Sequence, residues 1–269
     1  MSTTTLQMHA VVTPAEWLVA RKQLLAREKE YTHLRDALAA ERQALPWVKV
    51  EKSYTFDTPV GRKSLSELFE GRSQLAVYHF MFGPDWPEGC PSCSMAGDGF
   101  DGVLPHLNQR DVSFTAISRA ALPKIEAFKA RMGWRFPWAS SLLTTFNQDF
   151  RVSFTPEQLA SGKVYNYETV GFPAEEAPGF SVFAKDGLGN VFHTYSTFGR
   201  GLEELLGVYF FLDRVPKGRD ESEVKPHPMG WVRHHDKYAQ AEVVGSEQPL
   251  RAAAAAAKAE GGCCHGEKH

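Results

Sequence analysis

The sequence QLAVYHFMFGPDWPEGCPSCSMAG, residues 74–97, decides the fold. It opens with a run from Gln74 to Phe82 that is rich in apolar and aromatic residues, as in a buried strand. A short loop with two prolines leads to Cys90-Pro91-Ser92-Cys93, after which apolar residues recur at helical spacing. Two cysteines separated by two residues, where a buried strand passes into a helix, predict thiol–disulfide chemistry at this junction.

Cys90 and Cys93 have different expected roles. Unpaired backbone N–H groups and the helix dipole favour a thiolate at a helix N-terminus, so we expect a lowered pKa and nucleophilic attack at Cys90. Cys93 lies one turn further into the helix, where it can attack the mixed disulfide on Cys90 and close the ring. We therefore predict Cys90 as the catalytic nucleophile and Cys93 as the resolving thiol.

The elements downstream of this stretch alternate between strand and helix. We expect a strand at 111–118, a helix at 122–132, two strands within 180–195 and a last helix at 201–212. Residues 133–141 have the composition of an aromatic loop. Such alternation predicts an α/β fold built as a layered sheet.

The first 47 residues are expected to form a helical arm. Thr13-Pro14-Ala15-Glu16 carries the residues of a capping box with proline at the first helical position, and Pro46 ends the helical pattern near Leu45. Apolar residues occupy one face and charged residues the other, which predicts an amphipathic helix that packs on the main domain or on a second subunit. A homodimer is one expectation, although the heptads do not persist as in a coiled coil.

The composition changes again after Asp213. We expect residues 213–240 to form a docking segment, in which Trp231 to Tyr238 packs back on the core. Residues 241–269 are low in complexity, with six consecutive alanines, and predict a disordered tail. The main domain would then span residues 48–212.

Length and composition exclude several classes of protein. The chain has 269 residues, of which 43% are hydrophobic, so full disorder is excluded. A formal net charge of −2 argues against a nucleic-acid partner. No apolar run approaches the roughly 20 residues of a spanning helix, and the N-terminus does not resemble a signal peptide. We therefore expect a cytoplasmic protein without a membrane partner, in which a cysteine pair is redox-active or metal-binding rather than a static staple.

The strand, the loop with Trp86 and the Cys90-Pro91-Ser92-Cys93 motif resemble, in this order, the corresponding parts of the thioredoxin-like superfamily. Ala177-Pro178 and the strand after it resemble the cis-proline strand of thioredoxins, and the pattern from Asp57 to Gly71 resembles peroxiredoxin-type members. Over residues 13–240 the chain is similar to a bacterial family of thioredoxin-like proteins. Members of that family are described as dithiol–disulfide oxidoreductases or as proteins of unknown function.

The resemblance implies a thioredoxin-like central sheet flanked by helices, formed by residues 48–212. It implies substrate contacts at Pro178, which in thioredoxins lies against the cysteine pair, and at Trp86. The implied activity is that of a thiol–disulfide oxidoreductase that needs no organic cofactor. Its partners would be protein or small-molecule thiols and disulfides, together with a reductase that donates electrons.

A peroxiredoxin-like peroxidase is one alternative, and it would use the same Cys90. Peroxiredoxins carry a threonine shortly before the reacting cysteine, whereas residues 85–89 of this chain contain none. Arg119 could support a thiolate, but the sequence does not place it relative to Cys90. Peroxide reduction is therefore the less favoured interpretation.

A non-catalytic module that binds copper or zinc is the second alternative. Soft thiolates suit Cu(I), but a tetrahedral zinc site needs four ligands and the chain has no second Cys-x-x-Cys. His79, His193 or the adjacent tail cysteines Cys263 and Cys264, which precede His265, would have to complete it. We expect His79 to be buried and hydrogen-bonded instead, and we assign no metal ligand.

Overall fold

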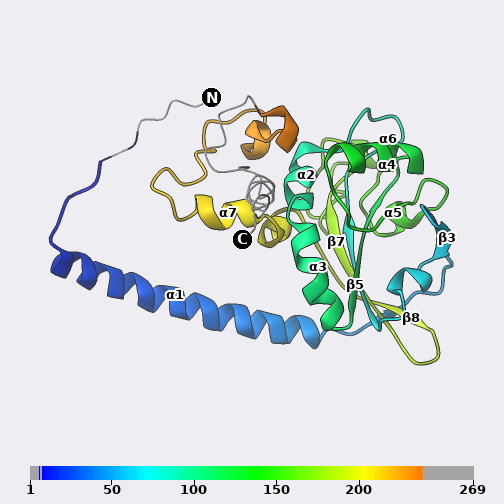
Figure 1. Ribbon diagram of the computed structural model, residues 1–269, viewed down its shortest axis with the longest axis horizontal. Helices are drawn as coiled ribbons and strands as arrows, with labels where there is room; N and C mark the ends of the chain where they lie inside the picture. Colours follow the sequence, from blue (N-terminus) through cyan, green and yellow to red (C-terminus); the bar gives the residue numbers. More distant parts are fainter. Residues whose placement is uncertain (1–5, 7, 239–269) are drawn as a thin grey trace, which may run out of the picture. The chain divides into compact units, whose positions relative to one another are not determined.

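The computed structural model describes residue 6 and residues 8–238. Its sheet is centred on β4 (Gln74–His79), which pairs in parallel with β5 (Val112–Ser118) and antiparallel with β7 (Gly179–Lys185). β6 (Trp138–Ser140) follows β5 in parallel, and β8 (Val191–Phe198) follows β7 antiparallel. A parallel crossover on one side of β4 and an antiparallel hairpin on the other form the mixed sheet of a thioredoxin-like fold. Figure 1 shows β5, β7 and β8 of this sheet. The expected fold class is confirmed.

Three short strands extend the sheet at its two edges. β1 (Val48–Lys49) pairs with β8, while β2 (Thr55–Thr58) pairs with β3 (Gly61–Ser64) and with β6. Across the described residues the strand order is β1-β8-β7-β4-β5-β6-β2-β3. The β2–β3 hairpin and the 3₁₀ helix η1 (Glu67–Phe69) follow the pattern expected between Asp57 and Gly71.

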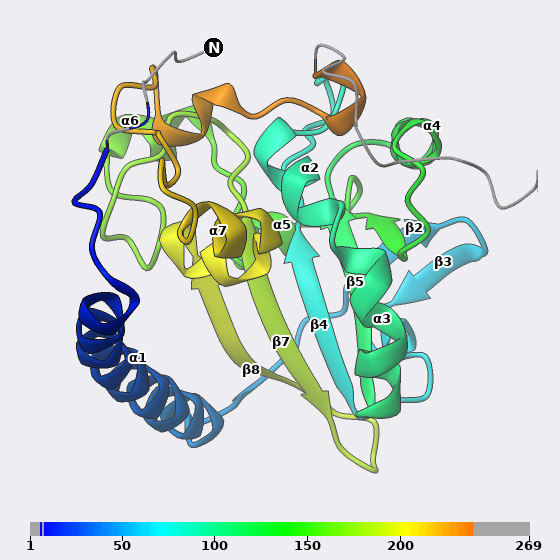
Figure 2. The same cartoon turned by 60° about the vertical axis from the view of Figure 1, so that its left-hand side comes forward.

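Helices cover the sheet and divide the interior into clusters. The remaining helices are α2 (Pro91–Gly97), α3 (Phe100–Gln109), α4 (Leu122–Arg131), α5 (Phe146–Asp149), α6 (Pro156–Ser161), η2 (Gly199–Leu205), α7 (Gly207–Leu212), η3 (Pro228–Trp231) and η4 (His235–Lys237). Figure 2 shows α2, α3 and α7 in front of β4, β5 and β7. Successive strand residues face opposite sides of a sheet, so Tyr78 belongs to the cluster under these helices, whereas Val77 belongs to a second cluster with Phe146.

Two expected helices are interrupted and one strand lies where a loop was expected. The helix after Cys90 ends at Gly97, and a second helix begins at Phe100. Asp98 caps the end of the first helix and Gly99 the start of the second. The helix expected at 201–212 is a 3₁₀ helix followed by α7. Within the aromatic loop 133–141, β6 pairs with β5. Three residues are too few to show a period of two in the sequence.

The N-terminal helix α1 (Pro14–Gln43) has the expected capping box between Thr13 and Glu16. None of its residues is buried. Its apolar residues are exposed, namely Trp17, Leu18, Val19, Leu24, Leu25, Tyr31, Leu34 and Leu38. The expected packing of this arm on the main domain is therefore not seen, and packing on a second subunit stays a prediction.

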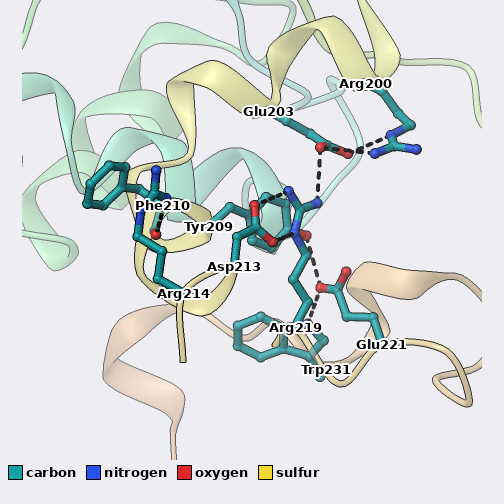
Figure 3. A network of polar contacts seen from close by, with 9 residues as sticks. All are labelled: Arg200, Glu203, Tyr209, Phe210, Asp213, Arg214, Arg219, Glu221 and Trp231. Atoms are coloured by element: carbon teal, nitrogen blue, oxygen red, sulfur yellow. Dashed lines mark hydrogen bonds and ion pairs between the residues drawn. The ribbon is translucent and has the colours of Figure 1, made fainter. Parts of the chain in front are cut away.

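The segment after α7 is joined to that helix by a polar network (Figure 3). The Arg219 guanidinium donates to both carboxylate oxygens of Asp213, at 2.6 and 2.8 Å, and to Glu203 at 3.0 Å. The Glu221 carboxylate accepts from the Tyr209 hydroxyl at 2.9 Å and from Trp231 Nε1 at 2.6 Å. Residues up to Asp236 fall into one compact unit, and only Lys237 and Tyr238 of the second, Lys237–His269, are described. The tail expected at 241–269 lies outside the described residues.

Candidate active site at Cys90 and Cys93

Cys90 is the N-cap residue of α2, which begins at Pro91. β4 ends at His79, and the chain then loops through Gly83–Gly89 before it enters α2. The Cys90 N–H donates to the Met81 carbonyl at 2.9 Å, and the Cys90 carbonyl accepts from the N–H and the hydroxyl of Ser94, both at 2.9 Å. The backbone of Cys90 is thus held on both sides, and its side chain is half-buried.

The surroundings of Cys90 stabilise its thiolate. The hydrogen bond from the Cys93 thiol lowers the pKa of Cys90 most, burial opposes it, and the backbone N–H groups of Cys93 and Ser92 add to the lowering. The resulting pKa is about 7, so close to half of the Cys90 side chains are thiolates at neutral pH. The expected lowering is present, and its largest cause is the neighbouring thiol.

Cys93 has the opposite character. Its side chain is 2% exposed, and burial together with the Cys90 thiolate raises its pKa well above the ordinary thiol value. The Tyr78 hydroxyl on β4 hydrogen-bonds to the Cys93 sulfur, which partly opposes this rise. Tyr78 is itself buried, and burial raises the pKa of its phenol, so it acts as a donor and not as a base.

Pro178 lies immediately before β7, whose first residue, Gly179, pairs with His79 at the end of β4. Its carbonyl accepts from the Tyr165 hydroxyl at 2.5 Å, and that hydroxyl accepts from the Gly199 N–H at 2.8 Å. The Ala177–Pro178 bond is trans, so the resemblance to the cis-proline strand of thioredoxins does not extend to the isomer of this bond. Burial raises the pKa of Tyr165 most, and a thiolate at Cys93 would raise it further. Pro178 is therefore at the same end of the sheet as the cysteines.

Trp86 lies in the loop between β4 and Cys90 and is half-buried against the cluster that contains Cys93. The Lys124 ammonium on α4 donates to the carbonyl oxygens of Trp86 at 2.9 Å and Pro84 at 2.7 Å. This lysine holds the loop that carries Trp86. No feature of the sequence near Lys124 indicated that role.

Arg119, at the end of β5, pairs with Glu176 rather than with a cysteine. The Arg119 Nη1 to Glu176 Oε1 distance is 2.8 Å, and the Ser153 hydroxyl donates to the other carboxylate oxygen at 2.6 Å. Burial raises the pKa of Glu176, although Ser153 and Arg119 oppose the rise. The charge of Arg119 is therefore engaged by a buried carboxylate.

The expectation that His79 is buried and hydrogen-bonded is confirmed. Its Nε2 is 2.8 Å from the Ser181 hydroxyl, which is 2.8 Å from the Ser196 hydroxyl, and His193 Nε2 lies 2.7 Å from Ser196. Burial lowers the pKa of His79 to about 3, so the ring is neutral. Tyr78, which contacts Cys93, and His79 are adjacent in a strand and point to opposite faces. His79 thus does not face the cysteine pair.

The metal interpretation gains no ligand cluster from the described part of the chain. There, no three His, Cys, Asp or Glu side chains gather as metal ligands would. Cys263, Cys264 and His265 lie outside it. A cavity of about 440 Å³ lies elsewhere, lined by residues that include Lys52 and Arg62. In residues 6 and 8–238, no helix has the length and apolar character required to span a bilayer.

Comparison with known proteins gives a family and distant structural likenesses. Two solved structures are a PrxQ mutant from Xylella fastidiosa (18% identity, 58% of this chain, 86% of that chain, TM-score 0.38) and the peroxidoxin BcpB from Mycobacterium tuberculosis (14%, 61%, 93%, 0.41). Likenesses of this degree carry no inference about activity. No curated protein matches the chain. Residues 6–238 match the family described as "Bacterial protein of unknown function (DUF899)", and the chain therefore belongs to that family.

Proposed function

We propose that this protein is a thiol–disulfide oxidoreductase in which Cys90 is the nucleophile and Cys93 the resolving thiol. The observation that carries the proposal is the opposite environment of the two neighbouring thiols. Cys90 is half-buried with a pKa of about 7, whereas Cys93 is buried with a raised pKa. One thiol is ready to attack at neutral pH, and the other is held protonated beside it.

The reaction proceeds in two exchanges. The Cys90 thiolate attacks one sulfur of a substrate disulfide, the substrate S–S bond breaks, and the first substrate thiolate leaves. The Cys93 thiol then gives its proton to solvent or to a departing thiolate and attacks Cys90 Sγ, which releases the second substrate thiolate. The substrate gains two electrons, and the protein retains a Cys90–Cys93 disulfide. A dithiol donor returns both cysteines to the reduced state by the reverse exchanges.

Pro178 and Trp86 are proposed to contact the substrate. Pro178 precedes β7 at the end of β4, and Trp86 belongs to the loop that enters Cys90. We further propose that the partners are protein or small-molecule disulfides and a thiol reductase, and that the reaction takes place in the cytoplasm.

Peroxide reduction at Cys90 is less well supported. A peroxidase also needs a thiolate, but its site must stabilise the developing charge on a peroxide oxygen. Arg119, the residue that the sequence offered for this role, is paired with Glu176. Residues 85–89 supply no threonine hydroxyl in the loop before Cys90.

Reduction of insulin disulfides by dithiothreitol tests the proposal. The wild type should accelerate the reaction, Cys90→Ser should return it to background, and Cys93→Ser should accumulate a mixed disulfide at Cys90. A Cys263→Ser/Cys264→Ser double variant is the matched control and should keep wild-type activity. Wild-type protein that does no better than background would refute the exchange reaction. Stoichiometric consumption of hydrogen peroxide in its place would favour the peroxidase.

A further inference from the structure

The segment Val232–Asp236, called here the C-terminal clasp, lies on the loop that enters Cys90. Figure 2 shows it in orange, above the start of α2. Its Val232 and His234 are buried, at 2% and 1% exposure. His234 Nε2 is 2.7 Å from the carbonyl oxygen of Gly89. Because a carbonyl oxygen only accepts, His234 must donate its Nε2–H in this bond.

The Gly89–Cys90 peptide unit is therefore held at both ends. His234 binds its carbonyl, and its N–H, which belongs to Cys90, donates to the Met81 carbonyl at 2.9 Å. Gly89 itself is enclosed, since a Cβ there would lie 2.7 Å from the Phe80 ring and 2.8 Å from the Phe128 ring. The Phe128 ring also meets the His234 ring edge-on, at 5.3 Å between centroids. Little freedom is left to this peptide unit while the clasp is in place.

The clasp is fixed to the elements on either side of the cysteines. His235 Nδ1 lies 2.7 Å from Asp98 Oδ1, at the end of α2. Asp236 pairs with Arg131 of α4 at 3.0 Å, and the same guanidinium contacts Glu88 at 2.8 Å, in the loop before Cys90. Upstream, the network around Arg219 and Glu221 holds the chain that leads to the clasp (Figure 3). The clasp thus bridges the loop, α2 and α4.

We propose that His234 is a positioning residue for Cys90. By holding the Gly89 carbonyl, it fixes the direction in which the Cys90 side chain leaves the backbone. That direction brings the sulfur to the N–H groups of Ser92 and Cys93, which stabilise the thiolate. Loss of the bond frees the peptide unit and weakens these contacts. This proposal adds a residue to the exchange function proposed above, and its biological meaning rests on that function. The alkylation test that follows does not depend on it.

Alkylation of Cys90 by iodoacetamide as a function of pH tests the proposal without any disulfide substrate. The variants carry Cys263→Ser and Cys264→Ser, and peptide mapping reports modification at Cys90 alone. His234→Phe keeps a ring against Phe128 and loses the donor. His234→Gln keeps an N–H group at the position of Nε2. His227→Gln is the matched control, because His227 is exposed and lies outside the clasp.

We expect His234→Phe to move the alkylation midpoint up by about 0.4 to 1 pH unit, as for the loss of one hydrogen bond. At pH 7 the reaction should slow by up to about 2-fold, because each remaining thiolate becomes more nucleophilic. His234→Gln should restore the wild-type curve, and His227→Gln should not change it. If His234→Phe does not fold, His234→Asn, whose shorter amide cannot reach Gly89, takes its place with the same expected shift. A folded donor-free variant with the wild-type curve would overturn the proposal, as would a glutamine variant that matches phenylalanine. Failure of insulin reduction with an intact shift would refute the exchange function alone.

Discussion

Replacement of Cys93 by alanine or serine separates the causes of the low Cys90 pKa. The hydrogen bond from the Cys93 thiol is the largest of them, ahead of the backbone N–H groups of Cys93 and Ser92. Alanine removes the donor and keeps the backbone, whereas serine keeps an O–H at nearly the same place. A hydrogen bond to a charged acceptor is worth about 1.5–3 kcal/mol. At about 1.36 kcal/mol per pH unit, Cys93→Ala should move the Cys90 titration up by about one to two pH units.

The consequence for reactivity changes sign with pH. At pH 7 the fraction of thiolate in Cys93→Ala falls from about one half to between about 1 and 10%. Each thiolate becomes more nucleophilic, because nucleophilicity rises with pKa at a slope of about 0.4–0.5. The net rate at pH 7 should therefore fall by about 2- to 8-fold. At pH 10, where both proteins are ionised at Cys90, the alanine variant should be about 3- to 10-fold faster.

Iodoacetamide alkylation between pH 5 and 10, followed at Cys90 by peptide mapping, measures both regimes. The tail cysteines are replaced by serine so that they consume no reagent. Cys93→Ser should follow the wild-type curve, since its hydroxyl can donate to the thiolate. Curves for alanine and wild type that do not cross, or a serine variant that behaves like alanine, would refute the assignment of the Cys90 pKa to this hydrogen bond.

Three further predictions concern stability. Burial holds the pKa of His79 at about 3 in the fold, against about 6.5 in the unfolded chain. The unfolded state thus binds more protons below pH 6.5, so the free energy of unfolding should fall as the pH drops from 6.5 towards 3, by about 2 kcal/mol at pH 5. Urea unfolding at pH 5 and pH 7 measures this loss of stability, which should be smaller in His79→Asn than in the wild type. Gly89→Ala should lower the melting temperature, through overpacking of about 1–3 kcal/mol, whereas Gly102→Ala, whose Cβ meets nothing within 4 Å, should not. Arg119→Met leaves the Glu176 carboxylate buried without its cation and should cost about 3 kcal/mol in urea unfolding, a loss that Glu176→Leu in the same chain should partly restore.

Local signals in the sequence account for most of the correct fold predictions. The apolar run at β4, the proline at the start of α4 and the capping box of α1 each involve neighbouring residues, so a short window contains the whole signal. The two-residue break between α2 and α3 gives no comparable signal. Phe100, the first residue after the break, is buried in the same cluster as Ala96, the residue just before the end of α2. β6 was missed because pairing with β5, and not its own period, makes it a strand.

The residues of the candidate site also fall into those with a local signal in the sequence and those placed by tertiary contacts. Cys90 and Cys93 could be proposed from the sequence because the motif and its place after a strand lie within one stretch. His234 could not, since it meets Gly89 from 145 residues away. In the sequence, Tyr78 looks like any aromatic residue of a buried strand. Only the fold brings it next to Cys93. Pro178 lies at the end of the sheet where β4 leads towards Cys90, but its trans peptide bond differs from the cis bond of the thioredoxin strand that it resembles.

In the proposed reaction, the pairing of Cys90 with Cys93 would also determine the order of the two exchanges. While Cys90 is a thiolate, its charge and the hydrogen bond that it accepts keep the proton on Cys93, and these effects raise the Cys93 pKa beyond the rise from burial. When Cys90 enters a mixed disulfide, its sulfur carries no charge and accepts hydrogen bonds only weakly, so both effects disappear. Burial then acts alone against the Tyr78 hydroxyl and the Met81 backbone, which favour the Cys93 thiolate. On this proposal, the first exchange would make Cys93 more acidic, so that the resolving thiolate would form more readily once there is a mixed disulfide to resolve.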